Sequence, residues 1–116
     1  MKLLWNVTVL VALLGAVASA QDAPKKITKS EALSAVATRV QPDYPSIARQ
    51  LKVQGTVELS VLVAENGSVA KVDIVSGNPM LTISAADALK RWKFKPFTED
   101  GKPIQVVAPI TVDFRL

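Results

Sequence analysis

Apolar and polar side chains alternate most regularly between residues 57 and 64, where Val or Leu occupies every second position. This period of two is typical of a β-strand that buries one face. Asn66-Gly67 follows, and the pair predicts a hairpin because both central residues of a type I′ turn adopt positive φ. In the returning strand, residues 68–75, the apolar positions slip by one residue, which indicates a β-bulge.

A helical period replaces this alternation after Asn78. Apolar side chains then recur at helical spacing, which predicts an amphipathic helix that ends near residue 92. Asn78 can cap this helix. Pro79 suits the first turn, because a backbone N–H at that position would have no acceptor within the helix and proline lacks this group. The inward-facing positions are Leu81, Ala85, Ala88, Leu89 and Trp92.

Alternation returns in the last segment of the chain, after a turn at residues 99–103. Its apolar face comprises Val106, Ala108, Ile110, Val112, Phe114 and Leu116. Pro109 lies on the other face and has no N–H to donate to a strand ladder. Its strand is therefore expected at an edge of the sheet, with the proline nitrogen facing outward, or at a bulge.

The segment before the hairpin allows two interpretations. Thr28-x-x-Glu31 spells a capping box and predicts a short helix, whereas the alternation over residues 36–40 favours a short strand ending at Val40. The strand is the preferred interpretation. Pro45 can begin a brief helix over residues 46–52.

The first twenty residues have the composition of a targeting segment. A single Lys precedes a mostly apolar run, and Ala18-Ser19-Ala20 offers the small residues that a signal peptidase accepts, so cleavage is expected before Gln21. The alternative is an uncleaved membrane anchor. We therefore expect a signal peptide or anchor at 1–20, a short linker at 21–35 and one domain at 36–116. The expected location is the periplasm, with contact to the membrane only if the leader stays attached.

The composition excludes most enzyme classes. With 116 residues the chain holds one domain. It contains neither Cys nor His, which removes the thiol nucleophile, the usual general base of Ser and Cys hydrolases, and the thiolate and imidazole metal ligands. Without the first twenty residues the chain keeps 13 basic and 10 acidic residues, but the export signal argues against nucleic acid as a partner. The basic cluster is interpreted as a solvated face; its members are Lys90, Arg91, Lys93 and Lys95.

No motif for catalysis or cofactor binding emerges. The five glycines lie singly, so no phosphate-binding loop is expected. Ser68-x-x-Lys71 matches the spelling of a penicillin-binding motif but follows a turn rather than opening a helix, which favours coincidence. Trp92, Phe94 and Tyr44 are interpreted as packed rings, the Tyr44 hydroxyl finding a backbone partner. The sequence thus predicts no enzyme, no cofactor and no metal site.

Taken in order, the motifs resemble those of the TonB C-terminal domain family over residues 40–116. They are Tyr44-Pro45-x-x-Ala48-Arg49, Gly55-x-Val57, Asn66-Gly67-x-Val69, Ser76-Gly77-x-Pro79-x-Leu81, Ala85-Ala86, Trp92-x-Phe94-x-Pro96, Gly101-x-Pro103 and Val112-x-Phe114. The resemblance implies an α+β fold, with helices packed on one face of a small three-stranded antiparallel sheet.

The resemblance also implies a function. In the periplasm, members of this family capture a short extended peptide of an outer-membrane receptor beside their last strand. This mode of binding is called β-augmentation. Carried over by position, the docking edge comprises Val107, Ala108, Pro109, Ile110, Thr111, Val112, Asp113 and Phe114. Pro109 is expected to limit pairing to the part of the edge on its C-terminal side.

The chain departs from a full energy transducer of this family. A transducer's anchor helix carries a His that couples it to the ExbB–ExbD motor, and this chain has no His. Its expected linker spans at most about 50 Å, and its leader has a cleavage site. A docking module for receptor or other envelope peptides is the preferred function. There are two alternatives. One is a transducer with an uncleaved anchor, and the other is a structural envelope protein that forms a homodimer through its edge strands.

Overall fold

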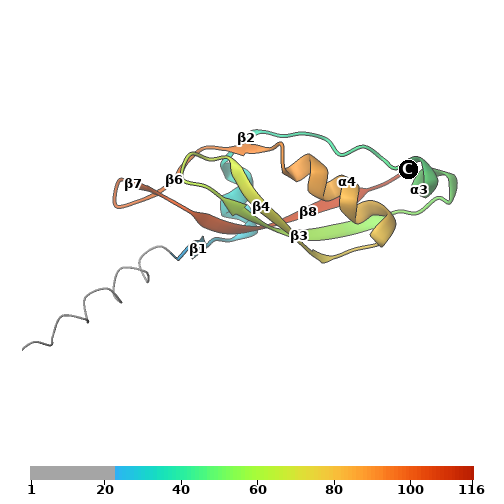
Figure 1. Ribbon diagram of the computed structural model, residues 1–116, viewed down its shortest axis with the longest axis horizontal. Coiled ribbons are helices and arrows are strands. Elements are labelled where there is room, and N and C mark those ends of the chain that lie inside the picture. Colours follow the sequence, from blue (N-terminus) through green and yellow to red (C-terminus); the bar gives the residue numbers. More distant parts are fainter. Residues whose placement is uncertain (1–22) are drawn as a thin grey trace, which may run out of the picture.

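The structure, a computed structural model, describes residues 23–116 (Figure 1). The expectations for residues 1–20 and for cleavage before Gln21 lie outside the described residues. Within residues 23–116, no helix is long and apolar enough to span a bilayer.

One sheet carries the fold. Its strands are β1 (Lys25–Lys26), β3 (Gly55–Val63), β4 (Val69–Ser76) and β8 (Val106–Phe114), in the order β1-β8-β3-β4. The three long strands are antiparallel, and β8 pairs with β3 along its whole length, from Val63↔Val106 to Gly55↔Phe114. The expected α+β architecture with an antiparallel sheet is confirmed. The two-residue strand β1, parallel to β8, adds a fourth member to the three strands expected.

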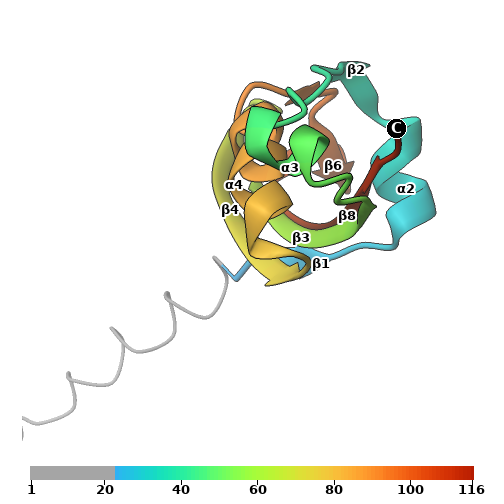
Figure 2. The ribbon, with the colours of Figure 1, turned by 90° about the vertical axis from the view of Figure 1, so that its right-hand side faces the viewer.

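The helices pack against the apolar face of this sheet. Helix α4 (Pro79–Leu89) lies against β3 and β4, and α2 (Lys29–Ser34) lies against β8. The short helix α3 (Ser46–Gln50) packs beside α4. In the end-on view of Figure 2, β4, β3 and β8 curve partly around α4. Two further pairs of short strands complete the domain: β2 (Val36–Thr38) with β5 (Lys93–Phe94), and β6 (Phe97–Glu99) with β7 (Lys102–Ile104).

The core follows the predicted periodicities. Every second side chain of β3 and β8 is buried, as are the predicted inward positions of α4. The alanines of α4 let the helix lie close to the sheet, and Trp92 and Phe94 are buried as expected. Leu116 is an exception: it lies beyond the end of β8 and is 59% exposed, so its assignment to the apolar face was wrong. The buried cluster of the described residues runs from Ala32 to Phe114, so we expect residues 23–116 to fold on their own.

The hairpin turn between β3 and β4 differs from the expected type. Only Gly67 has a positive φ, 89°, and its N–H donates to the carbonyl of Ala64 at 2.9 Å. Asn66 instead accepts from the N–H of Ser68 through its side chain, at 3.0 Å. Two successive positive φ values, the requirement of a type I′ turn, occur at Asp100 and Gly101 between β6 and β7. The expected bulge in β4 is confirmed by its register shifts against β3.

The segment expected as a linker belongs to the fold. Lys25 and Lys26 form β1, and the predicted capping box is present at the start of α2, with the Thr28 side chain bonded to the Glu31 N–H. Both interpretations of this region are therefore partly right, because the helix is followed by β2. The strand ends at Thr38 rather than Val40, since β2 pairs only with the two residues of β5.

Candidate functional site

Within the described part of the chain, strand β8 has no strand partner on one side over most of its length. Its inner side pairs with β3 throughout, whereas β1 covers only the start of its outer side. There, the N–H of Lys25 donates to Gln105 at 3.0 Å and that of Ile27 donates to the carbonyl of Val107 at 3.1 Å. The chain then turns into α2, and among residues 23–116 no strand pairs with β8 beyond Val107 on that side. Val107, expected within the free edge, is instead paired with β1.

The backbone groups that face outward can be identified from this pairing. Since the carbonyl of Val107 points to β1, and backbone groups alternate in direction along a strand, those of residues 109, 111 and 113 point the same way. The ring nitrogen of Pro109 therefore faces outward, as expected for a proline in an edge strand. Thr111 and Asp113 present both an N–H and a carbonyl on this side. An extended guest could pair with these two residues.

The side chains of β8 hold this edge in place. Ala108, Ile110, Val112 and Phe114 are all at most 9% exposed and pack in the core. On the opposite face, the Thr56 hydroxyl donates to the Asp113 carboxylate at 2.5 Å, which ties β8 to β3 beside the free edge. The edge is therefore rigid before any partner arrives, and a preorganised strand loses little conformational entropy on binding.

A groove of about 240 Å³ lies against this part of β8. Its lining residues are Arg39, Val40, Gln41 and Pro42 from the segment after β2, Ala88 and Trp92 from the α4 region, and Thr111, Val112 and Asp113 from β8. The Trp92 indole N–H donates to the carbonyl of Val40 at 2.9 Å, and the Arg39 guanidinium lies 5.0 Å from the Trp92 ring centroid. These contacts hold the segment 39–42 across the groove.

The 39–42 side of the groove was not predicted from the sequence. The signal available was Pro42, which together with Pro45 keeps the chain extended and limits its capacity to join a ladder. Nothing in the local pattern showed that this segment would face the last strand. The contact depends on Trp92, which lies 52 residues from Val40 in the sequence.

The first family-motif residues support the C-terminal end of β8. The Tyr44 ring meets the Phe114 ring edge-on with a centroid separation of 5.5 Å, and its hydroxyl donates to the carbonyl of Val53, as the sequence predicted. The Arg49 guanidinium lies 5.7 Å from the Tyr44 ring centroid. Pro45 precedes α3 at its N-cap, and Ala48 is fully buried.

The remaining motif residues shape the scaffold. Gly55 begins β3, Pro79 begins α4, and Pro96 is an exposed residue between β5 and β6. Gly77 lies so close to β3 that a Cβ atom there would be 3.1 Å from a methyl group of Val57. These residues build the domain and lie outside the groove, with the exception of Trp92, which contributes to both.

The charged side chains of the described residues form exposed ion pairs. Within residues 23–116, no group of three or more acidic side chains is placed to hold a metal ion. The hydrogen bond from Lys25 Nζ to the Glu99 carboxylate, 2.8 Å long, and the charge of Glu99 raise the pKa of Lys25 above its ordinary value. This exposed ion pair fastens β1 to the β6–β7 hairpin. The predicted basic cluster around Lys90 is exposed.

Comparison with known proteins gives a consistent assignment. The family described as Gram-negative bacterial TonB protein C-terminal matches residues 40–116. The chain is similar to Protein TonB of Vibrio cholerae, with 37% identity over 83 residues, which is 70% of this chain and 34% of that protein. The chain thus spans about a third of the length of the curated relatives it matches.

Two solved structures share the architecture. The solution NMR structure of the Pseudomonas aeruginosa TonB C-terminal domain matches with a TM-score of 0.60, covering 70% of this chain and 84% of that chain; at 20% identity this shows a common fold. The TonB2 protein of Vibrio anguillarum matches with a TM-score of 0.53 and 32% identity, covering 96% of this chain and 97% of that chain.

Proposed function

The chain belongs to the family of Gram-negative TonB C-terminal domains, and from this premise we propose that it docks extended peptide segments of TonB-dependent outer-membrane receptors or other envelope proteins. Proteins of this family are not enzymes, and a role in receptor-dependent transport is consistent with the membership. Docking takes place in the periplasm, where the leader at residues 1–20 directs the domain. The docking module supports energy-dependent transport, in which this chain recognises the peptide segment.

One observation carries this proposal: the outward N–H and carbonyl groups of Thr111 and Asp113 have no ladder partner among residues 23–116 and face a groove. Unpaired groups at a sheet edge are a template for another strand. In β-augmentation, main-chain hydrogen bonds supply affinity, and pockets for alternate side chains supply specificity. The groove beside Arg39 and Trp92 receives side chains of the guest.

The available edge is short, and both of its limits are structural. On the N-terminal side β1 occupies Val107, and Pro109 offers a carbonyl but no N–H. On the C-terminal side, β8 ends at Phe114. A guest therefore pairs over about five residues, and affinity has to come partly from side chains in the groove.

A proline substitution tests the proposal. Thr111→Pro removes an outward N–H and should leave the β3 ladder intact, because Pro109 already occupies an equivalent outward position. Thr111→Val keeps the N–H and serves as the matched control. With residues 23–116 and synthetic peptides of receptor plug segments, we expect Thr111→Pro to weaken binding at least about 10-fold, through a lost hydrogen bond and the bulk of the ring. Thr111→Val should bind within about 2-fold of the wild type.

Calorimetric titration measures these affinities, and circular dichroism establishes that both variants are folded. If a folded Thr111→Pro variant binds the peptides as tightly as the wild type, the guest does not use the edge of β8. If no plug peptide binds the wild type at all, the domain does not dock receptors in this way.

A further inference from the structure

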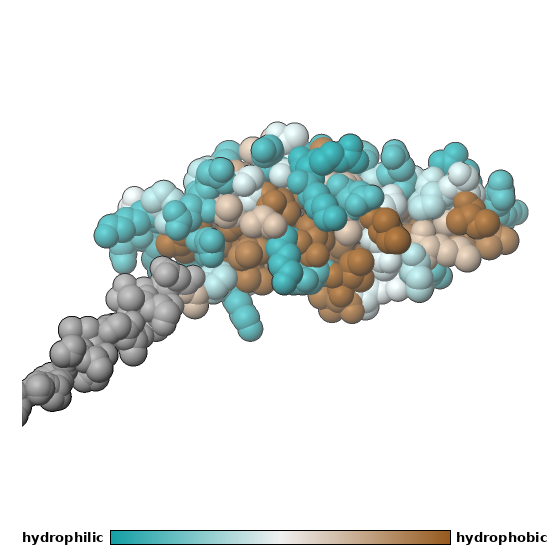
Figure 3. Space-filling view, in the orientation of Figure 1, coloured by the Kyte–Doolittle hydropathy of each residue, from teal (hydrophilic) through white to brown (hydrophobic). Residues whose placement is uncertain are grey.

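The sheet has a second free edge, at strand β4. Within residues 23–116, β4 pairs with β3 on one side and with no strand on the other. It contains no proline, and two of its apolar side chains, Ile74 and Val75, are 47% and 62% exposed. Figure 3 shows apolar surface over this region of the molecule. Neither the groove beside β8 nor a second groove, between α4 and the segment that leads into α3, is lined by a residue of β4.

The alternation of backbone groups shows what this edge offers. The backbone N–H and carbonyl groups of the even-numbered residues of β8 point to β3, where they lie opposite odd-numbered residues. The even-numbered residues of β3 therefore direct their own backbone groups to the other side, toward β4. Ser60 and Leu62 thus bond to Asp73 and Lys71. It follows that Val72, between these two, directs its N–H and carbonyl outward. Register shifts on either side confine the regular part of β4 to residues 71–74.

We propose that β4 is the interface for a second copy of this chain, paired antiparallel about a two-fold axis that passes beside Val72. In this arrangement Val72 exchanges two backbone hydrogen bonds with Val72 of the second copy. Lys71 of each copy lies opposite Asp73 of the other. This interface lies at the far edge of the sheet from β8, and the inference does not depend on the proposed docking function.

The charges of β4 select this register. Opposite residues of an antiparallel pair share a face, so the axis must pass beside one residue of the short regular stretch. Centred on Lys71 the strand sets lysine against lysine, and centred on Asp73 it sets aspartate against aspartate; like charges directly opposite one another are destabilising. Centred on Ile74 it sets Asp73 against the apolar Val75 and forms no pair of opposite charges. Centred on Val72, it forms two Lys71–Asp73 pairs. These are non-hydrogen-bonded pairs, in which side chains approach most closely.

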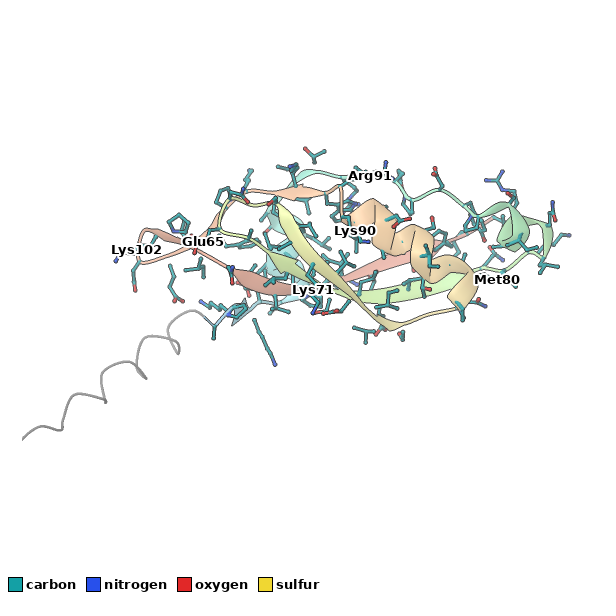
Figure 4. All side chains as sticks on the ribbon, viewed as in Figure 1. Glu65, Lys71, Met80, Lys90, Arg91 and Lys102 are labelled. Atoms are coloured by element: carbon teal, nitrogen blue, oxygen red, sulfur yellow. The ribbon has the colours of Figure 1, made fainter. Side chains whose placement is uncertain are left out.

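The two charged side chains are exposed and lie on the same face of β4. In one chain Lys71 Nζ lies 3.8 Å from a carboxylate oxygen of Asp73, and both side chains are at least 60% exposed. Figure 4 labels Lys71 on this strand. Two copies joined about Val72 bring four charges of alternating sign together on the solvent face of the sheet. A network of this kind stabilises more than an isolated surface pair.

The other face of the joined strands is apolar. Val72 and Ile74 lie opposite Val61 and Leu59 of β3, on the face that carries the core. In the dimer the Val72 side chains meet across the axis, and Ile74 of each copy lies diagonal to Val72 of the other, so its exposed surface is covered. The dimer thus has one continuous sheet with a β8 edge near each end. Both docking edges remain accessible.

A charge-swap series tests the interface. Sedimentation equilibrium of residues 23–116, up to about 1 mM because so short an interface is weak, should show a monomer–dimer equilibrium. Lys71→Asp and Asp73→Lys each set like charges against one another twice and should each raise the dimer dissociation constant at least about 10-fold. The double variant has the same composition as the wild type and reverses both charges, so it should restore the wild-type constant within about 3-fold.

A cross-link tests the axis. The chain has no Cys, so Val72→Cys introduces a single thiol. In the proposed dimer the Cα atoms of residue 72 in the two copies lie about 5.5 Å apart, which is within the range of a disulfide. Oxidation should give a covalent dimer, whereas Glu65→Cys, in the exposed turn, should give none. A strictly monomeric wild type, a dimer insensitive to the single charge swaps, or a double variant as weak as the single ones would each overturn the proposal. Loss of plug-peptide binding with the dimer intact would count against the docking function alone.

Discussion

Gly67 connects the central hairpin to the segment that follows α4. Its carbonyl accepts a hydrogen bond from the Phe94 N–H at 2.9 Å, and its own φ of 89° lies in the left-handed region. A Cβ atom at this position would overlap the Phe94 carbonyl oxygen. Because Phe94 belongs to the core, the backbone of this turn is fixed by the packing of the core.

Substituting this glycine should be costly. Gly67→Ala adds both left-handed strain and a backbone overlap, and we expect it to reduce the free energy of unfolding by about 3 kcal/mol. Gly101→Ala is the matched control: it has a φ of 80° but open space around the added Cβ, so about 1 kcal/mol should be lost. Urea denaturation of both variants gives the comparison. If both variants lose the same free energy of unfolding, the overlap with the Phe94 carbonyl does not contribute to the cost at Gly67.

Strand β1 shortens the free edge of β8, and an exposed ion pair reinforces its attachment. Two backbone hydrogen bonds join the β1 segment to the start of β8, and the Lys25–Glu99 contact ties it to the β6–β7 hairpin as well. The pKa of Lys25 is raised in the folded protein, so the contribution of this pair is complete below the ordinary value of 10.5 and is lost as the pH rises through the higher folded value. Between pH 6 and 9 β1 should therefore stay attached.

Amide hydrogen exchange can measure this attachment. Glu99→Gln removes the negative charge, and we expect the Ile27 amide to exchange faster while the amides of β3 keep their rates. Asp100→Asn leaves the hydrogen bond to Lys25 intact and is the control. Corrected for intrinsic rates, protection of Ile27 in the wild type should be constant from pH 6 to 9. Unchanged protection in Glu99→Gln would mean that the ion pair does not hold β1.

The elements that the sequence predicted are those with a sustained hydrophobic period. Strands β3 and β8 and helix α4 each extend over nine or more residues, so their buried faces repeat several times. The two- and three-residue strands β1 and β5 to β7 have no such repeat and form only because distant partners align with them. The turn at Gly67 was assigned to the wrong type because its geometry follows from the contact with Phe94.

The candidate site was predicted to a similar extent. Pro109 pointed to the free edge of β8 by a local argument, the missing N–H. The occupation of Val107 by β1 and the Arg39–Pro42 side of the groove depend on contacts between segments far apart in the sequence. No periodicity reports such contacts.

At the scale of the whole molecule, the sheet has two edges of different character. The β8 edge is bounded by β1 and Pro109 and faces a groove, which suits a short guest peptide. The β4 edge has opposite charges arranged symmetrically about Val72, which suits a second copy of the chain. A dimer of this kind would present two docking edges to the envelope, and two linked sites bind a pair of tethered peptides more tightly than one.

The most direct test of the docking edge is amide hydrogen exchange of residues 23–116 with and without a saturating receptor plug peptide. We expect the Thr111 and Asp113 amides, which face outward, to become protected on binding. The Ile110 and Val112 amides already face β3 and should keep their protection. This alternation along one strand is specific to strand addition. Binding that leaves Thr111 and Asp113 exchanging at their free rates, or that protects β4 instead, would contradict the account.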